Sequence, residues 1–410
     1  MPKSCWTSLL TALVIMVPIE AGAVELIQLG QVEALGTYTS IKDSEDDYGA
    51  DTSAFYSPVL KFNDTFCLIP LVDVHFNSYP QYLPQEEGNS FYNTYLVTNL
   101  HIAARKEYKP GWFIKLTPLA TWNIMKETPD DDWGDGLYDY TDYGVEAELR
   151  HIISGASSEQ HYSSAFEYYK RTYPNFTTLI SSTTVTPPEV HEKDYHGLKY
   201  SARAERNYTN LGGWYFEPYL LQKLYSDKHT VNDDGTLDLN EDRHDYEVGL
   251  NFGGTYLPRN LSRFQLSLDN DYVINNSNMS YYDTRNTLGL GDDVFTDKYY
   301  DYQSFSIAPG VEYAHPIGNE KSIRLRLGYD YTVRWYSDRK AQFSNGDYRS
   351  QDQHDQEHTY SAILRIPLIK SVDFVVNYAL NHVDSNQKFE DFYRYSFDSY
   401  SIKTGISWRF

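Results

Sequence analysis

Apolar and polar residues alternate along most of this chain with a period of two, and this alternation constrains the fold more than any other feature. It is clearest over 321–337, where every second position is apolar: Ile323, Leu325, Leu327, Tyr329, Tyr331, Val333 and Trp335. The charged residues between them are Arg324, Arg326, Asp330 and Arg334. A helical stripe repeats about every 3.6 residues, whereas successive side chains of a strand point to opposite faces. The segment is therefore predicted to be a β-strand with one apolar face and one polar face.

Similar segments recur along the chain and predict an all-β protein. They are 28–42, 54–62, 65–79, 91–105, 112–128, 141–155, 161–173, 195–206, 214–228, 244–257, 263–276, 300–315, 321–337, 357–369, 373–387 and 398–410. Short connections alternate with long ones between them, as in an up-and-down antiparallel barrel with turns at one end and loops at the other. The predicted fold is a transmembrane β-barrel of about sixteen strands, within a range of roughly 14 to 18.

Prolines lie inside several of the predicted strands, at Pro70, Pro118, Pro218, Pro309 and Pro367. Proline removes a ladder hydrogen bond, and a closed barrel has no free edge on which to place it. We therefore expect β-bulges at these positions, or strand ends that lie closer to the rim.

Hydropathy and composition agree with a barrel that crosses a membrane. No apolar run after residue 23 is long enough for a membrane helix, and the mean hydropathy is −0.58. Only alternate strand residues of a barrel face lipid, so averages over a window stay polar. The chain contains 39 Tyr, which suit the two membrane interfaces because tyrosine has an apolar body and a polar tip. A tyrosine-rich secreted β-sandwich would share this composition, and the regular succession of strands favours the barrel.

The first 23 residues have the features of a cleaved secretory signal. Lys3 precedes an apolar run over 9–18, and the small residues Ala21, Gly22 and Ala23 precede Val24. The predicted mature chain, residues 24–410, then holds a single cysteine, Cys67. This excludes a disulfide framework and a thiol pair for metal or redox chemistry.

The last eleven residues, Tyr400–Phe410, alternate in the same way and end on an aromatic side chain. This end resembles the closing strand of bacterial outer-membrane β-barrels, whose assembly machinery reads such a terminus. The resemblance implies the Gram-negative outer membrane, contact with lipid and lipopolysaccharide, and Ile406, Trp408 and Phe410 as the assembly signal. Because long connections outnumber short ones by one, both chain ends are expected on the periplasmic, short-turn side. The less apolar first segments are a candidate seam for a homo-oligomer.

The acidic charge of the chain lies in the predicted loops. The formal net charge is −22, and the long connections together hold 30 acidic and 9 basic residues, so the strands and short turns are nearly neutral. This balance excludes nucleic acid as a partner, since a phosphate backbone needs a basic surface. The acidic loops either serve solubility alone, or hold divalent cations that bridge to lipopolysaccharide phosphates, or bias the mouth toward cationic solutes.

The polar faces of the predicted strands carry charges of both signs. Buried charges must be hydrated or paired, and sixteen strands enclose an aqueous channel, whereas about eight are filled by side chains. The residues predicted to line the lumen are Glu146, Glu148, Arg150, Lys199, Arg203, Glu247, Arg324, Arg326, Asp330, Arg334, Arg365 and Lys403. Acidic residues concentrate on the middle strands and basic residues on the last four, which resembles the transverse field of general porins.

Residues 230–241 follow the spacing of a twelve-residue calcium loop. Asn232, Asp234 and Asp238 are candidate oxygen ligands and Glu241 is the candidate bidentate carboxylate. The first position is Thr230 instead of aspartate, and strands flank the loop, so an ordinary acidic hairpin is the alternative. Apart from this calcium ion the sequence predicts no cofactor.

The function predicted from these features is passive passage of hydrophilic solutes through a porin-like channel. The alternatives are a conduit of a polysaccharide-export or a protein or lipoprotein secretion system, and a structural or adhesive barrel that acts through its loops. Enzymatic activity is not predicted, because the sequence lacks G-x-S-x-G and H-E-x-x-H, and its histidines have no nucleophile at a recognisable spacing.

Overall fold

The computed structural model describes residues 24–42, 46–79, 93–126, 131–176, 191–283, 294–318, 321–390 and 394–410, and the predicted signal lies outside them. No helix in these ranges is long and apolar enough to cross a membrane. Their strands are β1 (Glu25–Ile27), β2 (Gly30–Ile41), β3 (Asp47–Tyr56), β4 (Val59–Asn63), β5 (Phe66–Tyr79), β6 (Asn93–Lys109), β7 (Trp112–Lys126), β8 (Tyr140–Ser154), β9 (Ser158–Thr172), β10 (Tyr195–Tyr208), β11 (Gly212–Val231), β12 (Leu237–Tyr256), β13 (Phe264–Ser277), β14 (Tyr281–Asp283), β15 (Val294–Thr296), β16 (Tyr302–Gly318), β17 (Lys321–Gln342), β18 (Tyr348–Ile369), β19 (Val372–Ser385) and β20 (Phe397–Arg409).

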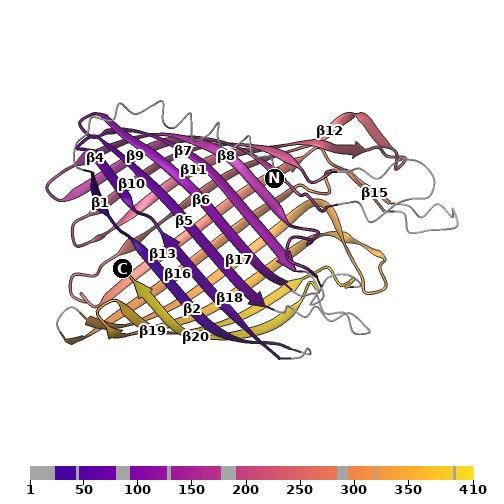
Figure 1. The fold of residues 1–410 in the computed structure, drawn as a ribbon. Helices are drawn as coiled ribbons and strands as arrows, with labels where there is room; N and C mark the ends of the chain where they lie inside the picture. The colour runs from indigo at the N-terminus through magenta and orange to yellow at the C-terminus, as the bar shows by residue number, and fades with distance from the viewer. Residues whose placement is uncertain are drawn as a thin grey trace.

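The strands close into an antiparallel barrel (Figure 1). Pairing runs from β2 through β3 and β5–β13 to β16–β20, and β20 pairs back with β2. Two of the barrel strands are interrupted, because β1 leads into β2 and β3 leads into β4, while β1 pairs with β4. The large sheet is therefore a closed circuit of sixteen barrel strands, which confirms the predicted fold class and topology. The pair β14–β15 forms a separate small hairpin.

The prolines fit into the barrel differently from our expectation. Pro218 lies on β11, and the pairing of β11 with β12 is continuous there. The pairing of β11 with β10 is interrupted at this point and resumes in the same register. The ladders around Pro118 and Pro309 show the same one-sided lapse. A strand residue directs its N–H and C=O toward one neighbour only, so proline interrupts one ladder and spares the other. The predicted bulges are therefore wrong at these three positions.

The other two prolines lie where one neighbouring ladder is already interrupted. Pro70 pairs with β6, and on its other side lies the gap between β3 and β4. Pro367 lies beside the turn that follows β18, where a register shift occurs as expected.

Three predicted long connections are shorter than the sequence suggested. The strand β3 begins at Asp47, β11 and β12 continue to a turn at 232–236, and β17 and β18 continue to a turn at 343–347. Figure 1 shows β12 extending beyond the main body of the barrel at the long-loop end. Polar residues at these strand ends had masked the continuing period of two, because both faces of an extended hairpin can be in water.

Register divides the barrel residues into an outer and an inner set, since directly paired residues share a face. On β8 the exposed side chains of Tyr143, Val145 and Leu149 lie on one face, and Glu146 and Glu148 lie on the other. Following the pairs around the circuit assigns each later strand in the same way and returns to β8 without contradiction. The exposed apolar face is the outer surface, and the charged face surrounds the lumen.

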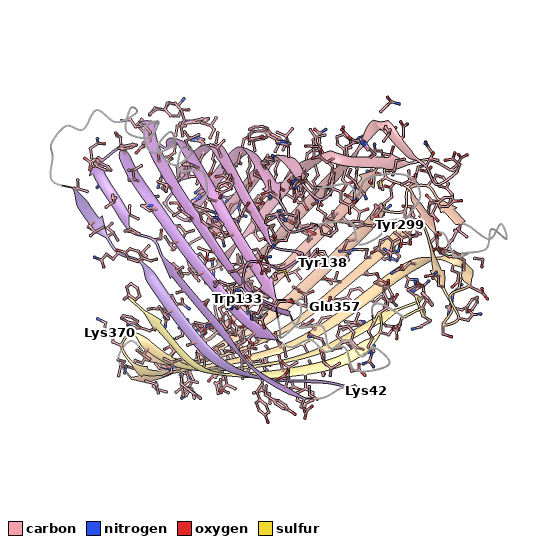
Figure 2. All side chains as sticks on the ribbon, turned by 45° about the vertical axis from the view of Figure 1, so that its right-hand side comes forward. Lys42, Trp133, Tyr138, Tyr299, Glu357 and Lys370 are labelled. Atoms are coloured by element: carbon pink, nitrogen blue, oxygen red, sulfur yellow. The ribbon has the colours of Figure 1, made fainter. Side chains whose placement is uncertain are left out.

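The end of the chain closes the circuit. The backbones of Gly30 and Phe410 donate a hydrogen bond to each other, both at 3.0 Å. The Phe410 ring lies against Gly30, where a β-carbon would come within 2.4 Å of its Cζ atom. Figure 2 shows Lys370, in the turn before β19, at this end of the barrel, and Lys42, in a long-loop connection, at the other.

Candidate functional site

Two parts of the inner face of the barrel form walls of different chemistry. We call the inner faces of β8–β13, β16 and β17 the aromatic wall. Its tyrosines are Tyr140, Tyr169, Tyr195, Tyr215, Tyr219, Tyr225, Tyr302 and Tyr336. We call the inner faces of β18–β20, β2 and β3 the small-residue wall. Serine, threonine, glycine and asparagine are its most frequent uncharged residues, and no tyrosine or tryptophan faces inward within the bounds given above for these five strands.

Arginine–aspartate pairs stand between the tyrosines of the aromatic wall. Arg171 donates from Nε and Nη2 to the two carboxylate oxygens of Asp142, at 2.8 and 2.7 Å. Its guanidinium carbon lies 3.9 Å from the centre of the Tyr140 ring. Arg243 makes the same bidentate contact with Asp245, at 3.1 and 2.8 Å. Its guanidinium carbon lies 4.7 Å from the ring centre of Tyr225. These planar pairs neutralise the arginines while leaving them stacked on aromatic rings.

Two tyrosine rings of this wall lie against glycines of the next strand. A β-carbon at Gly197 would lie 2.3 Å from the Cζ atom of Tyr169, and one at Gly249 would lie 2.1 Å from Cζ of Tyr219. Only glycine permits so close an approach of a ring to the backbone. One face of each ring is therefore covered by the wall, and both side chains remain half-exposed.

Tyrosine hydroxyls of the same wall donate to carboxylates. Tyr219 Oη donates to Glu247 Oε1 at 2.8 Å, and Tyr215 Oη donates to Asp269 Oδ1 at 2.8 Å. The carboxylate of Glu247 also lies 3.7 Å from Lys223 Nζ. The tyrosine rings of this wall therefore have carboxylates as neighbours.

Toward the short turns, β7, β8, β10 and β11 carry clustered ion pairs. Lys115 Nζ lies 2.9 Å from Glu146 and 2.5 Å from Glu148, which also accepts a bond from Arg150 at 2.7 Å. In the second cluster, Arg203 lies 3.0 Å from Glu205 and 2.9 Å from Glu217. Side chains of one strand and its neighbours therefore pair the charges locally.

Ion pairs of the small-residue wall connect residues far apart in sequence. Asp373, with a side chain 5% exposed, lies 2.6 Å from Arg409 and 3.8 Å from Arg324. Arg365 lies 3.1 Å from Glu33. These contacts link the first and last strands of the chain.

Lys403 makes a further ion pair of the small-residue wall, near the middle of the strands. Its Nζ donates to Asp51 at 2.6 Å, and Asp51 also lies 3.0 Å from His75 Nε2. The pair bridges β20 and β3 across β2, because small β2 side chains leave room for the lysine stem.

The structure places all twelve residues predicted for the lumen on the inner face. Those not yet described also have identifiable surroundings: Lys199 Nζ lies 5.1 Å from the Tyr219 ring centre, Arg334 lies 4.7 Å from that of Tyr302, and Asp330 accepts a long bond of 3.4 Å from Thr332. Arg326 makes no ion pair within the described ranges.

The predicted separation of acidic and basic walls requires a correction. The basic residues Arg324, Arg365 and Lys403 of the last strands are matched by Asp373, Glu33 and Asp51, which lie two or three strands away around the barrel. Sequence order hid this match, because Glu33 and Asp51 come from the beginning of the chain. Arg326 and Arg334 on the inner face of β17 have no carboxylate within ion-pair distance in the part that the structure describes.

Our sequence interpretation missed the inner tyrosines, since it assigned the tyrosine content to the membrane interfaces. The neighbours Tyr168 and Tyr169 show the distinction: Tyr168 faces outward and Tyr169 faces the lumen. Position relative to the charged face of each strand was the signal that could have found them.

The predicted calcium ligands do not converge in the structure. Residues 230–241 form a tight hairpin, in which Asp234 accepts bonds from the backbone and the hydroxyl of Thr236. These bonds lower the pKa of Asp234. Glu241 accepts from Asn278 at 2.9 Å, and no group of three or more His, Cys, Asp or Glu in the described ranges could hold a metal ion. The hairpin contradicts the calcium-loop geometry because strand pairing separates Asp238 and Glu241 from the turn.

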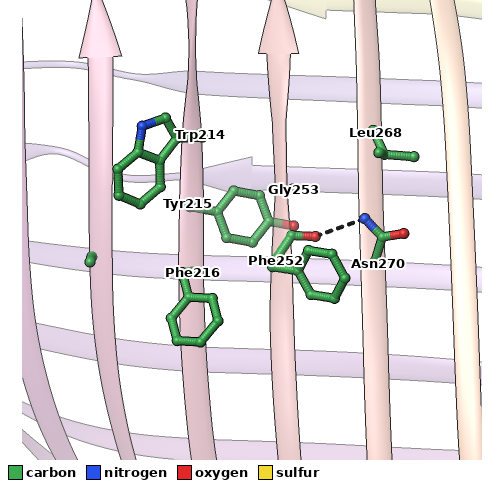
Figure 3. A pocket seen from close by; sticks show the side chains of 8 residues that line it. Trp214, Tyr215, Phe216, Phe252, Gly253, Leu268 and Asn270 are labelled. Atoms are coloured by element: carbon green, nitrogen blue, oxygen red, sulfur yellow. Dashed lines mark hydrogen bonds between the residues drawn. The ribbon is translucent and has the colours of Figure 1, made fainter.

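A hollow of about 610 Å³ lies on the outer side of β10–β13 (Figure 3). The outward side chains of Trp214, Phe216, Phe252 and Leu268 line it, together with Asn270, whose Nδ2 donates to the Phe252 carbonyl at 3.2 Å. Its apolar rim and outward direction separate it from the lumen.

No protein-family model and no curated protein matches the chain. Among solved structures the chain is similar to a loop-deleted OmpT, an outer membrane protein of Vibrio cholerae, with 11% identity, a TM-score of 0.42, and coverage of 95% of this chain and 100% of that one. It is also similar to the outer membrane channel DcaP of Acinetobacter baumannii, with 13% identity, a TM-score of 0.43, and coverage of 95% and 98%. For OccK8 (OprE) of Pseudomonas aeruginosa the identity is 11%, the TM-score 0.39, and the coverage 93% and 98%. These likenesses do not indicate what this chain carries.

Proposed function

We propose that this protein is an outer-membrane channel through which hydrophilic solutes pass passively. The observation that carries the proposal is the closed sixteen-strand circuit, with an apolar outer face and a charged inner face all the way around. A barrel of this size encloses more space than its side chains fill, and charged groups on its inner face require water or partners. Paired charges along the walls supply a polar path from one end to the other.

The outer face supports placement in a membrane. Side chains such as Leu220, Val248 and Leu327 are 46–50% exposed there and would face hydrocarbon. The short turns and Phe410 share one end, and we propose that this end faces the periplasm. Lipid and lipopolysaccharide would then surround the barrel.

The exposed end of β20 suits the proposed contact with the barrel-assembly machinery. Ile406, Trp408 and Phe410 lie on the outer face and are 50%, 47% and 45% exposed. The outer faces of β2 and β3 carry small residues such as Ala34, Gly36 and Ala54, which supports a seam for a homo-oligomer on this side.

Nothing in the described lumen favours an enzyme over a channel. The close pair of His382 and Asp398, with 2.6 Å between Nδ1 and Oδ1, lies on the outer face of β19 and β20. It is turned toward the membrane interface and away from the lumen, where a hydrophilic substrate would pass.

Single-channel recording in planar lipid bilayers tests the proposal. The refolded mature chain, residues 24–410, is expected to give stepwise ion currents that scale with salt concentration. A folded barrel that stays silent would contradict the channel function and favour an export conduit closed without its partners, or a structural barrel. Folding is checked independently by the faster electrophoretic migration of unheated barrels.

A further inference from the structure

We propose that the aromatic wall of the lumen binds neutral saccharides, so that the channel takes this class of solute in preference to others of the same size. The inference rests on the proposed channel function and adds the substrate class. Three features of the wall carry it: flat rings, polar groups beside them, and arginines near the platforms that are paired with carboxylates.

The rings of Tyr169 and Tyr219 form flat platforms. Each lies against a glycine of the next strand, Gly197 for the first and Gly249 for the second, so the platforms cover β9–β12. One ring face is held by the wall and the half-exposed side chain offers the other face to the lumen. A sugar ring has apolar C–H faces, which pack on aromatic rings of this kind.

Polar groups lie at the edges of the platforms. The Tyr219 hydroxyl and Lys223 both contact Glu247 at the edge of one platform, and Lys199 Nζ lies over the Tyr219 ring, 5.1 Å from its centre. A carboxylate accepts several hydrogen bonds and an ammonium group donates three, so both can serve the hydroxyls around a sugar ring. Apolar faces and polar edges of the wall thus match those of a saccharide.

The charge around the platforms favours a neutral ligand. Arg171 and Arg243 are occupied by bidentate bonds to Asp142 and Asp245 and do not attract an anion as free guanidinium groups would. Carboxylates such as Asp269 line the same wall. An acidic sugar would meet like charges here, which costs affinity.

The experiment measures block of the ion current by sugars. Maltohexaose is added to bilayers that contain the full mature chain, and a polyethylene glycol of equal hydrodynamic size is the control for simple obstruction. We expect maltohexaose to block at a concentration about tenfold lower than the polymer, and a galacturonate hexamer to block more weakly than maltohexaose. Equal block by maltohexaose and the polymer would overturn the inference and leave the channel function intact.

Matched variants locate the effect. The double substitution Tyr169→Leu with Tyr219→Leu is expected to raise the half-blocking concentration of maltohexaose about fivefold or more. The control, Tyr168→Leu with Tyr246→Leu, removes outward tyrosines that are 37% and 40% exposed and should leave the block unchanged. Equal losses in both pairs, or no loss in either, would contradict the role of the platforms.

Two further measurements keep the outcome decisive. If the Tyr169/Tyr219 variant does not fold, Tyr219→Phe keeps the ring and removes its hydroxyl, and a loss of block of about twofold is expected. If the wild-type barrel carries no current, the channel function fails, and calorimetry of maltohexaose with the folded barrel still tests binding. Absence of heat in that titration would overturn the saccharide site itself.

Discussion

The two walls of the lumen stabilise buried charge in different ways. On the aromatic wall, guanidinium groups stand between tyrosine rings, as Arg171 does beside Tyr140, and pair with a carboxylate on the same or the adjacent strand. On the small-residue wall, long basic side chains lie along the sheet, and the residues beneath them are covered. Ser407 is 0% exposed and Val375 is 1% exposed, although both face the lumen.

This difference shows that residue size on the inner face decides where a cation can lie. Small residues leave space for the stem of an arginine or lysine, which therefore reaches partners two strands away, as Lys403 reaches Asp51. Bulky rings occupy that space, and their faces attract the cation instead. One wall consequently holds the ends of the chain together, and the other presents ring surfaces to a solute.

The largest effect is expected from removal of the acid that joins two arginines at the short-turn end of the small-residue wall. Asp373→Ala leaves Arg409 and Arg324 without their shared carboxylate. Loss of one member of a buried pair costs about 3–5 kcal/mol, and the partial exposure of both arginines reduces this to about 2–3 kcal/mol of unfolding free energy. Urea unfolding in lipid vesicles, followed by tryptophan fluorescence, measures the change.

The matched control is Asp330→Ala, also on the inner face of the last strands. Asp330 is exposed and accepts one long bond from Thr332, so its loss should cost less than about 0.5 kcal/mol. Equal costs for the two substitutions would show that the small-residue wall does not depend on its ion pairs.

A smaller effect is expected when a ring of the aromatic wall is displaced. Gly249→Ala places a methyl group 2.1 Å from the Tyr219 Cζ atom, so the ring must move. Such overpacking costs about 1–3 kcal/mol. The same unfolding assay applies, with Gly36→Ala as the control, because the nearest atom to a β-carbon there is 3.9 Å away. If Gly249→Ala is as harmless as its control, the ring is not held by the glycine.

The smallest effect concerns ion selectivity at the border between the walls. Arg326 and Arg334 on β17 have no carboxylate within ion-pair distance in the described ranges, so they contribute positive potential to the lumen. Replacing both by glutamine should raise the cation-to-anion permeability ratio roughly two- to threefold. Reversal potentials in a KCl gradient measure the ratio. Arg206→Gln, on the outer face of β10, should leave it unchanged, and a shift of equal size in that control would refute the local assignment.

Much of the barrel could be predicted because strand alternation is a local property. The period of two over 321–337 gave both the strand β17 and its inner face, and each predicted segment overlaps one barrel strand. The prolines and the ends of β12 and β18 were predicted less well. A proline affects one ladder or the other depending on strand register, and a hairpin that extends into water has no apolar face to mark it.

The candidate site was only half predictable. The alternation of side chains along each strand placed Glu146, Arg324 and the other charged residues on the inner face. It could not show that Asp373 lies between two arginines or that the Tyr169 ring packs on Gly197. The residues of the calcium interpretation give a related example. Ligand spacing in a sequence specifies a site only if the backbone turns those residues toward one point, and here strand pairing keeps them apart.

The sequence by itself determined which side chains face oil and which face water, because alternation follows from the geometry of a single strand. It also determined the approximate number of strands and the end at which they close. The tertiary structure alone decided how the inner side chains meet, because closure brings β20 against β2 and residues nearly 400 positions apart into contact. Register and curvature, which no single strand contains, therefore created the two walls and the ring platforms on the aromatic wall.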